Sequence, residues 1–187
     1  MTGRWETLSR EIAYTCEGFD IVHEEVRLPD GQRADFDYLS EGESVVVLPF
    51  TDDGRVVIVE EWRQAVGRRN RGLPAGSVEP GEDPDRAARR ELREETGYEA
   101  DTVEHMTAVE PANGFADALF HYYVARGCTD AGEQDLDANE TITADTATLD
   151  ALLAGTRDGS VGDGRTAFGV TYYALFEGGD SADPGAG

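Results

Sequence analysis

Three closely spaced glutamates are the residues of this sequence best placed to do chemistry. Glu91 and Glu95 are four positions apart, so on a helix they lie one turn apart on one face, with Glu94 beside them. Like charges at this spacing repel each other, and a divalent cation would turn the repulsion into ligation. Mg²⁺ takes oxygen ligands and is commonly bound by one or two carboxylates together with substrate phosphates, and Mn²⁺ accepts similar ligands. The cluster therefore indicates a metal site for a phosphorylated substrate; the alternative is a solvated acidic helix face.

The residues around these glutamates carry the signals of a helix with defined ends. Asp83 is a good N-cap residue, and Pro84 suits the first helical position, where a missing N–H costs nothing. Gly97 is typical of the left-handed residue that ends a helix. We therefore expect a helix over residues 84–96, preceded by a loop at 76–83.

The glutamates belong to a longer pattern of fixed spacing. A glycine, five residues, a glutamate and seven residues precede Arg-Glu-apolar-any-Glu-Glu-any-Gly-apolar, with the fixed positions at Gly76, Glu82, Arg90, Glu91, Glu94, Glu95 and Gly97. In this pattern, called the box from here on, the chain resembles the Nudix hydrolase family. The resemblance implies that Glu91 and Glu95 ligate Mg²⁺ together with the backbone carbonyl of Ala75. It also implies that Glu82 supports the site from the loop, and that Glu94 takes part in catalysis by orienting Arg90, with which it can pair one turn away.

Segments outside the box resemble one branch of the family, the ADP-ribose pyrophosphatases. Glu61-Trp62-Arg63-Gln64 and Leu73-Pro74-Ala75-Gly76 are similar to motifs of that branch. There, an arginine at the place of Arg63 contacts the diphosphate of the substrate. The segment Glu110-Pro111-Ala112-Asn113-Gly114-Phe115-Ala116-Asp117 resembles a proline-containing loop beside the active site. Pro111 is therefore a substrate-binding candidate.

The general base is not assigned by the motif. Many relatives carry a glutamate in the proline-containing loop where this chain has Ala118. Asp117 is adjacent but would point the opposite way if it begins a strand, because successive side chains alternate. Glu140 lies where some relatives carry an acidic residue ahead of a strand. We therefore favour Glu140 over Asp117, with a glutamate of the box as the remaining alternative.

The N-terminal region is expected to bind the base of the substrate. The resemblance implies an N-terminal β-region that forms an intertwined homodimer and holds adenine between aromatic side chains. Phe19 and Phe36 are the candidates by their position relative to the turn at Pro29-Asp30-Gly31. For each of them the alternative is a plain place in the sheet core.

The reaction implied by the resemblance is attack of water on a phosphorus of a nucleoside diphosphate sugar. For ADP-ribose the products are AMP and ribose 5-phosphate. Two alternatives remain: a Nudix hydrolase acting on another nucleoside diphosphate derivative, and a module that binds ADP-ribose without cleaving it. Ala118 favours the binding module, and the intact set of box glutamates opposes it.

The charge and composition of the chain indicate its environment. All 16 basic residues are arginine, against 39 acidic residues, and the net charge is −23. Such a composition resembles that of proteins from halophiles, in which salt screens the repulsion. It argues against nucleic acid as a partner, because no basic patch could neutralise phosphates. With no signal peptide or membrane span visible, we expect a cytoplasmic protein with Cys16 and Cys128 reduced and buried. His23, His105 and His121 are expected to be sheet residues rather than ligands.

The order of elements predicts an α/β (α+β) fold, the α/β/α sandwich of the Nudix family with a mixed sheet, preceded by an antiparallel β-region. We expect residues 1–42 to form the β-region, 43–177 the Nudix domain and 178–187 a disordered tail. The other expected elements are strands at Trp5–Cys16, Phe19–Leu28, Arg33–Leu39, Ser44–Phe50, Arg55–Trp62, 101–110, 118–126 and 139–144, and helices at 146–155 and 164–177.

Overall fold

The computed structural model describes residues 3–16, 18–138 and 140–178, which form two compact units. The N-terminal unit runs to Glu43 and also includes Val109–Phe120, while the second unit contains Ser44–Ala108 and the chain from His121 onward. The sequence had placed 109–120 in the domain that begins at residue 43. Within the described residues, none of the helices combines the length and apolar character needed to cross a membrane.

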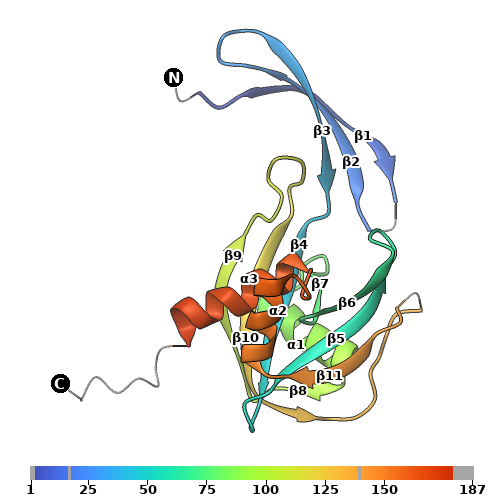
Figure 1. The fold of residues 1–187 in the computed structure, drawn as a ribbon. Coiled ribbons are helices and arrows are strands. Elements are labelled where there is room, and N and C mark those ends of the chain that lie inside the picture. Colours follow the sequence, from blue (N-terminus) through green and yellow to red (C-terminus); the bar gives the residue numbers. More distant parts are fainter. Residues whose placement is uncertain (1–2, 17, 139, 179–187) are drawn as a thin grey trace, which may run out of the picture. The chain divides into compact units, whose positions relative to one another are not determined.

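The N-terminal unit is built on an antiparallel sheet of three strands in the order β1-β2-β3 (Figure 1). The strands are β1 (Glu6–Thr15), β2 (Asp20–Arg27) and β3 (Arg33–Ser40). The segment 109–120 joins this unit through the end of β3. Leu39 forms a parallel bridge with Ala116, and the backbone N–H of Asp117 donates to the carbonyl of Leu39 at 3.0 Å.

The second unit contains a sheet with strand order β11-β5-β4-β10-β8, in which β6 pairs with β5, β7 with β4 and β9 with β10. The pairings of β5 with β4, β6 and β11 are antiparallel. The strands are β4 (Glu43–Thr51), β5 (Val56–Arg63), β6 (Arg68–Gly72), β7 (Ala75–Ser77), β8 (Tyr98–Glu99), β9 (Thr102–Val109), β10 (Leu119–Asp130) and β11 (Thr143–Ala147). The helices are α1 (Pro84–Thr96), α2 (Leu149–Asp158) and α3 (Gly164–Tyr172), with a π-helical turn at Tyr173–Glu177.

Helices cover both faces of this sheet. Successive side chains of β10 point to opposite faces. Tyr123 belongs to a buried cluster with Leu92 of α1, whereas the ring of its neighbour Tyr122 lies 4.8 Å from that of Phe168 on α3. The residues of β4 from Val45 to Leu48 have no exposed surface, as expected for a strand buried on both sides. The predicted α/β/α fold class is thereby confirmed.

The segment after β10 departs most from the sequence-based expectation. The strand predicted at 139–144 is wrong in its bounds: residues 140–142 belong to no strand, and residue 139 lies outside the described residues. The observed strand β11 continues to Ala147 because it pairs with β5 as far as Val56. The helix predicted at 146–155 consequently begins later, after Thr148, whose side chain accepts the N–H of Ala151 at 3.1 Å. Most of the predicted tail, from residue 179, lies outside the described residues.

The two cysteines differ in burial. Both are free thiols, and burial raises the pKa of Cys128 to about 12. Cys16 is partly exposed rather than buried, because it follows the end of β1, where its Sγ–H donates to the carbonyl of Phe19. The three histidines all lie on strands: His23, His105 and His121.

Candidate active site

The helix that carries the glutamates has the bounds predicted from the sequence. The side chain of Asp83 accepts the N–H of Asp85 at 2.9 Å, and Pro84 occupies the first turn. Gly97 ends the helix in the left-handed conformation with φ 75°. Because both ends are fixed by local contacts, the positions of Glu91 and Glu95 along α1 are fixed as well.

Both of these glutamates face the short strand β7. Glu91 is 9% exposed and Glu95 is 4% exposed. A Cβ atom added to Gly76 would lie 2.1 Å from the carboxyl carbon of Glu91, so the space that this carboxylate uses exists only beside a glycine. The backbone N–H of Ala75 donates to Oε2 of Glu95 at 2.9 Å. Two buried carboxylates therefore meet consecutive residues of β7.

Burial dominates the electrostatics of this pair. It raises the pKa of Glu95 to about 8, although the Ala75 N–H and the charge of Arg165 act in the opposite direction. Burial also raises the pKa of Glu91, with Arg90 opposing the shift. The site thus contains more buried carboxylate than its positive charges compensate, which is the situation that a bound cation relieves.

Arg90 holds the other box carboxylates together. Its guanidinium donates through Nε and Nη2 to both oxygens of Glu82, at 3.1 and 2.9 Å. Its Nη1 donates to Glu91 at 2.8 Å and to Glu94 at 2.9 Å, which confirms the predicted pair with Glu94. A further bond reaches the carbonyl of Ser77 at 2.9 Å. Arg90 therefore fixes the orientation of Glu91 from outside, and it lowers the pKa of Glu82.

The donor set of Glu91 and Glu95 fits a hard divalent cation. Within the described residues, no group of three or more His, Cys, Asp and Glu side chains has the arrangement of a complete metal centre. Mg²⁺ does not require one, because it keeps several waters and uses one or two carboxylates with substrate phosphates. Two carboxylates beside a backbone segment are therefore sufficient as the ligands that the protein supplies to such a site.

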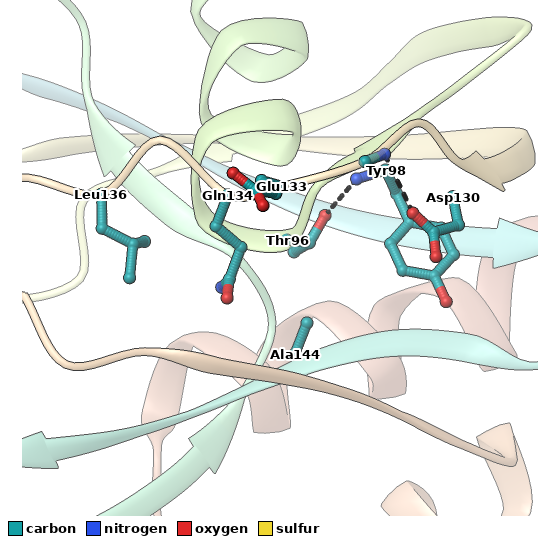
Figure 2. A pocket seen from close by; sticks show the side chains of 8 residues that line it. Thr96, Tyr98, Asp130, Glu133, Gln134, Leu136 and Ala144 are labelled. Atoms are coloured by element: carbon teal, nitrogen blue, oxygen red, sulfur yellow. Dashed lines mark hydrogen bonds between the residues drawn. The ribbon is translucent and has the colours of Figure 1, made fainter.

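The loop between β10 and β11 is attached to the carboxyl end of α1. The side-chain amide of Gln134 donates to the backbone carbonyl of Glu95, and the N–H of Asp135 donates to the carbonyl of Glu94 at 3.0 Å. Figure 2 shows Gln134 lining the same pocket as Thr96 at the end of α1. These bonds satisfy carbonyls that a helix end leaves without internal partners. They also attach the start of the segment that leads to Glu140 to α1.

The structure brings Glu140 near the box glutamates. The negative charge of Glu140 contributes to the raised pKa of both Glu91 and Glu95. Its own carboxylate accepts the N–H of Asp137 at 3.0 Å. Asp117, the rival candidate, belongs to the N-terminal unit and accepts the hydroxyl of Ser40 at 2.7 Å.

Sequence reasoning missed two residues near the box, Arg165 of α3 and Gln134. Arg165 lines a small cavity together with the predicted residue Arg63, which lies at the end of β5 and pairs with Glu61 at 2.8 Å. Neither Arg165 nor Gln134 belongs to a motif, and their contacts arise only when distant segments come together. The one local signal was Asp163, the N-cap that indicates where α3 begins just before Arg165.

The remaining substrate candidates lie in the N-terminal unit. Phe36 is 42% exposed on β3, with its ring 5.3 Å from that of Trp5, and Phe19 is 37% exposed just before β2. Neither is a core residue, so the alternative of a plain core position is wrong for both. Pro111 is exposed in the segment 109–120. Trp5 is an aromatic neighbour of Phe36 that the sequence did not single out.

Fold and site define an α/β/α protein with a buried carboxylate pair on the first helix of its second unit. Residues 41–162 match the NUDIX domain family, and the chain belongs to that family. It is 32% identical over 173 residues to an ADP-ribose pyrophosphatase of Bacillus subtilis (strain 168), covering 92% of this chain and 94% of that one. The same identity and coverage relate it to a methanol dehydrogenase activator of Bacillus methanolicus.

Two further comparisons agree with this assignment. An ADP-ribose pyrophosphatase of Mycobacterium tuberculosis is 32% identical over 137 residues, which are 73% of this chain and 66% of that one. Among solved structures, an ADP compounds hydrolase superposes with a TM-score of 0.83 at 18% identity, covering 96% of this chain and 97% of that one. At this identity the likeness shows the fold alone.

Proposed function

We propose that this chain is a Nudix hydrolase that cleaves the diphosphate bond of ADP-ribose, giving AMP and ribose 5-phosphate. The observation that carries the proposal is the buried carboxylate pair of Glu91 and Glu95 against β7. A bound cation would stabilise two buried carboxylates of this kind. Two relatives similar along most of this chain's length are ADP-ribose pyrophosphatases. A related nucleoside diphosphate sugar is the alternative substrate.

In this proposal Mg²⁺, or Mn²⁺ in its place, is held by Glu91, Glu95 and the backbone carbonyl of Ala75. When bound, the metal lowers the pKa of a coordinated water and neutralises charge on the diphosphate oxygens. Glu82 and Glu94 act through Arg90, to which both are bonded, and so keep Glu91 in place. Glu94 and Glu95 thus contribute to catalysis by building the site.

The general base in this proposal is Glu140. Its carboxylate is held in a turn by Asp137 and lies close enough to Glu95 to affect its pKa. A base in this position takes the proton from the attacking water. Ala118, at the position where many relatives carry a glutamate, is 1% exposed and offers no such group.

Substrate contacts are proposed for both units. Arg63 would donate to the diphosphate, because a guanidinium matches two phosphate oxygens at once. In the N-terminal unit, Phe36 and Phe19 expose aromatic faces on which adenine could stack, and Pro111 would border the substrate.

The second candidate function is binding without cleavage, because a relative of equal identity is named a methanol dehydrogenase activator. The decisive experiment is product analysis after incubation with ADP-ribose and Mg²⁺ in molar KCl. Formation of AMP and ribose 5-phosphate, abolished by EDTA and by Glu95→Gln, is the expected result. Saturable binding without cleavage would establish the binding module instead. Cleavage of other nucleotide sugars but not of ADP-ribose would change the assigned substrate and leave the assigned reaction as it is.

We further propose that the protein works as a homodimer in the cytoplasm of a halophile. The excess of acidic residues and the exclusive use of arginine as the basic residue support the halophile, and the resemblance to a branch with an intertwined N-terminal β-region supports the dimer. Unfolding measured at increasing KCl concentrations tests the halophilic character, since the free energy of unfolding should rise as salt screens the repulsion between acidic residues. Light scattering at several protein concentrations tests the dimer, and a monomer at all of them would exclude it.

A further inference from the structure

Two arginines from distant parts of the sequence line one small cavity in the second unit. Arg63 comes from the end of β5 and Arg165 from the first turn of α3. Asn70 and the partly buried acids Glu61 and Asp163 complete its polar lining. Each guanidinium group is paired with one of these acids through a single nitrogen, Arg63 with Glu61 and Arg165 with Asp163, which leaves its other nitrogens for a ligand.

Most donors of Arg165 have no partner among the residues that the structure describes. Its Nε donates to Oδ1 of Asp163 at 3.3 Å, while neither of its Nη atoms forms a hydrogen bond within the described part of the chain. The side chain is only 28% exposed. Arg63 is similar: it is 39% exposed, and Nη2 pairs with Glu61 at 2.8 Å. Partly enclosed guanidinium groups with open donors are suited to a ligand with several acceptor oxygens.

The position of Arg165 is fixed relative to the candidate metal site. The neighbouring Thr166 donates its hydroxyl to Asp163 at 2.6 Å and accepts the backbone N–H of Leu73 at 2.9 Å. Leu73 lies two residues before Ala75, whose N–H is bonded to Glu95. The start of α3 is therefore tied to the backbone that meets the carboxylate pair, and the charge of Arg165 is close enough to lower the pKa of Glu95.

We propose that Arg165 is a second phosphate-binding residue, which acts beside Arg63 on the diphosphate of the substrate. This inference rests on the proposed hydrolysis of a nucleoside diphosphate sugar. The carboxylate pair by itself repels an anionic substrate, and guanidinium groups next to it would offset that repulsion and orient the phosphoryl oxygens. Ligand binding would engage the Nη atoms while Nε keeps its bond to Asp163.

The test compares steady-state kinetics of Arg165→Gln, Arg165→Lys and Arg63→Gln with ADP-ribose and Mg²⁺ in KCl. Arg157→Gln is the matched control, because Arg157 is an exposed arginine of α2 and its loss changes the net charge equally. A lost charge-assisted contact predicts a KM raised roughly 10- to 100-fold for Arg165→Gln. Arg165→Lys should recover part of the lost affinity, since lysine keeps the positive charge but lacks the planar set of donors of a guanidinium group. The double variant with Arg63→Gln should lose less than the product of the single losses.

The proposal is overturned if Arg165→Gln keeps its KM within about twofold of the wild type, or if Arg157→Gln loses as much. If Arg165→Gln does not fold, Arg165→Lys decides: unchanged affinity overturns the proposal, and a raised KM supports it. Failure of the wild type to cleave or bind ADP-ribose would instead refute the proposed function. In that case binding of inorganic pyrophosphate by the same variants decides, since equal affinity of wild type and Arg165→Gln overturns the role and weaker binding supports it.

Discussion

The carboxylate of Glu91 lies directly against the Cα of Gly76. A Cβ atom at Gly76 would be 2.1 Å from the carboxyl carbon and 2.2 Å from each carboxylate oxygen of Glu91. The glycine of the box is therefore required by the close approach of a side chain and not by backbone conformation, since its φ lies outside the left-handed region. Because Arg90 fixes Glu91 from the other side, the carboxylate has little freedom to move away.

Gly76→Ala should therefore displace Glu91 and weaken metal binding more than it weakens the fold. Overpacking of this kind costs about 1–3 kcal/mol of stability, but the displaced carboxylate loses its place in the site. We expect activity to be lost at low Mg²⁺ and partly restored at high Mg²⁺, as measured by metal titration of the initial rate. Gly3→Ala is the control, because a Cβ there meets only ordinary contacts with Pro29. An unchanged Mg²⁺ dependence in Gly76→Ala would contradict the placement of Glu91 as a ligand.

The metal-free protein should lose stability as the pH rises from about 4.5 to about 8, the window between the ordinary glutamate pKa and that of Glu95. Its raised pKa means that the folded state binds the proton more tightly than the unfolded state in this window. Unfolding then releases protons, so the free energy of unfolding falls with rising pH, by on the order of a few kcal/mol. Thermal unfolding in EDTA at several pH values measures the slope. Glu95→Gln should reduce the slope, leaving the contribution of Glu91, whose pKa burial also raises. Saturating Mg²⁺ should reverse the slope, because the metal binds the deprotonated carboxylates. A slope that is unchanged in Glu95→Gln would place the titrating group elsewhere.

Sequence reasoning was most accurate where the structure depends on local signals. In α1, Asp83 is the N-cap, Pro84 begins the helix and Gly97 ends it. Each acts through contacts within the helix itself, so its bounds could be predicted residue by residue. The relative placement of Glu91, Glu94 and Arg90 then followed from helical periodicity alone.

The parts that were not predicted depend on pairing between distant segments. Strand β6 has the polar sequence of Arg68–Gly72 and is a strand only because it pairs with β5. The limits of β11 are likewise set by β5, and the membership of 109–120 in the N-terminal unit is set by the bridge of Ala116 to Leu39. Tertiary pairing of this kind overrides local propensity.

Glu140→Gln should lower kcat roughly 10²- to 10⁴-fold with little change in the Mg²⁺ requirement, because it removes a proton acceptor and leaves Glu91 and Glu95 in place. The comparison variant is Asp117→Asn. The carboxylate of Asp117 is already used by Ser40 and by the N–H of Glu41, so its loss should affect the stability of the N-terminal unit and not the chemical step. Single-turnover rates separate chemistry from product release. Wild-type kcat in Glu140→Gln, with a large loss in Asp117→Asn, would exchange the two roles.

Gln134→Leu should lower kcat while KM stays close to that of the wild type. The side-chain amide of Gln134 donates to the backbone carbonyl of Glu95 on α1 and lies 3.5 Å from the carbonyl of Ile142, two residues after Glu140. We therefore expect Gln134 to hold the segment of the candidate base against α1. Loss of the bond should cost about 1 kcal/mol of stability, which stability measurements can separate from the kinetic effect. A double-mutant cycle gives the mechanism: if Gln134 acts through Glu140, adding Gln134→Leu to Glu140→Gln should lower kcat no further. Gln32→Leu, in an exposed turn of the N-terminal unit, is the matched control. Independent, multiplicative losses in the cycle would show that Gln134 supports the helix end alone and does not position the base.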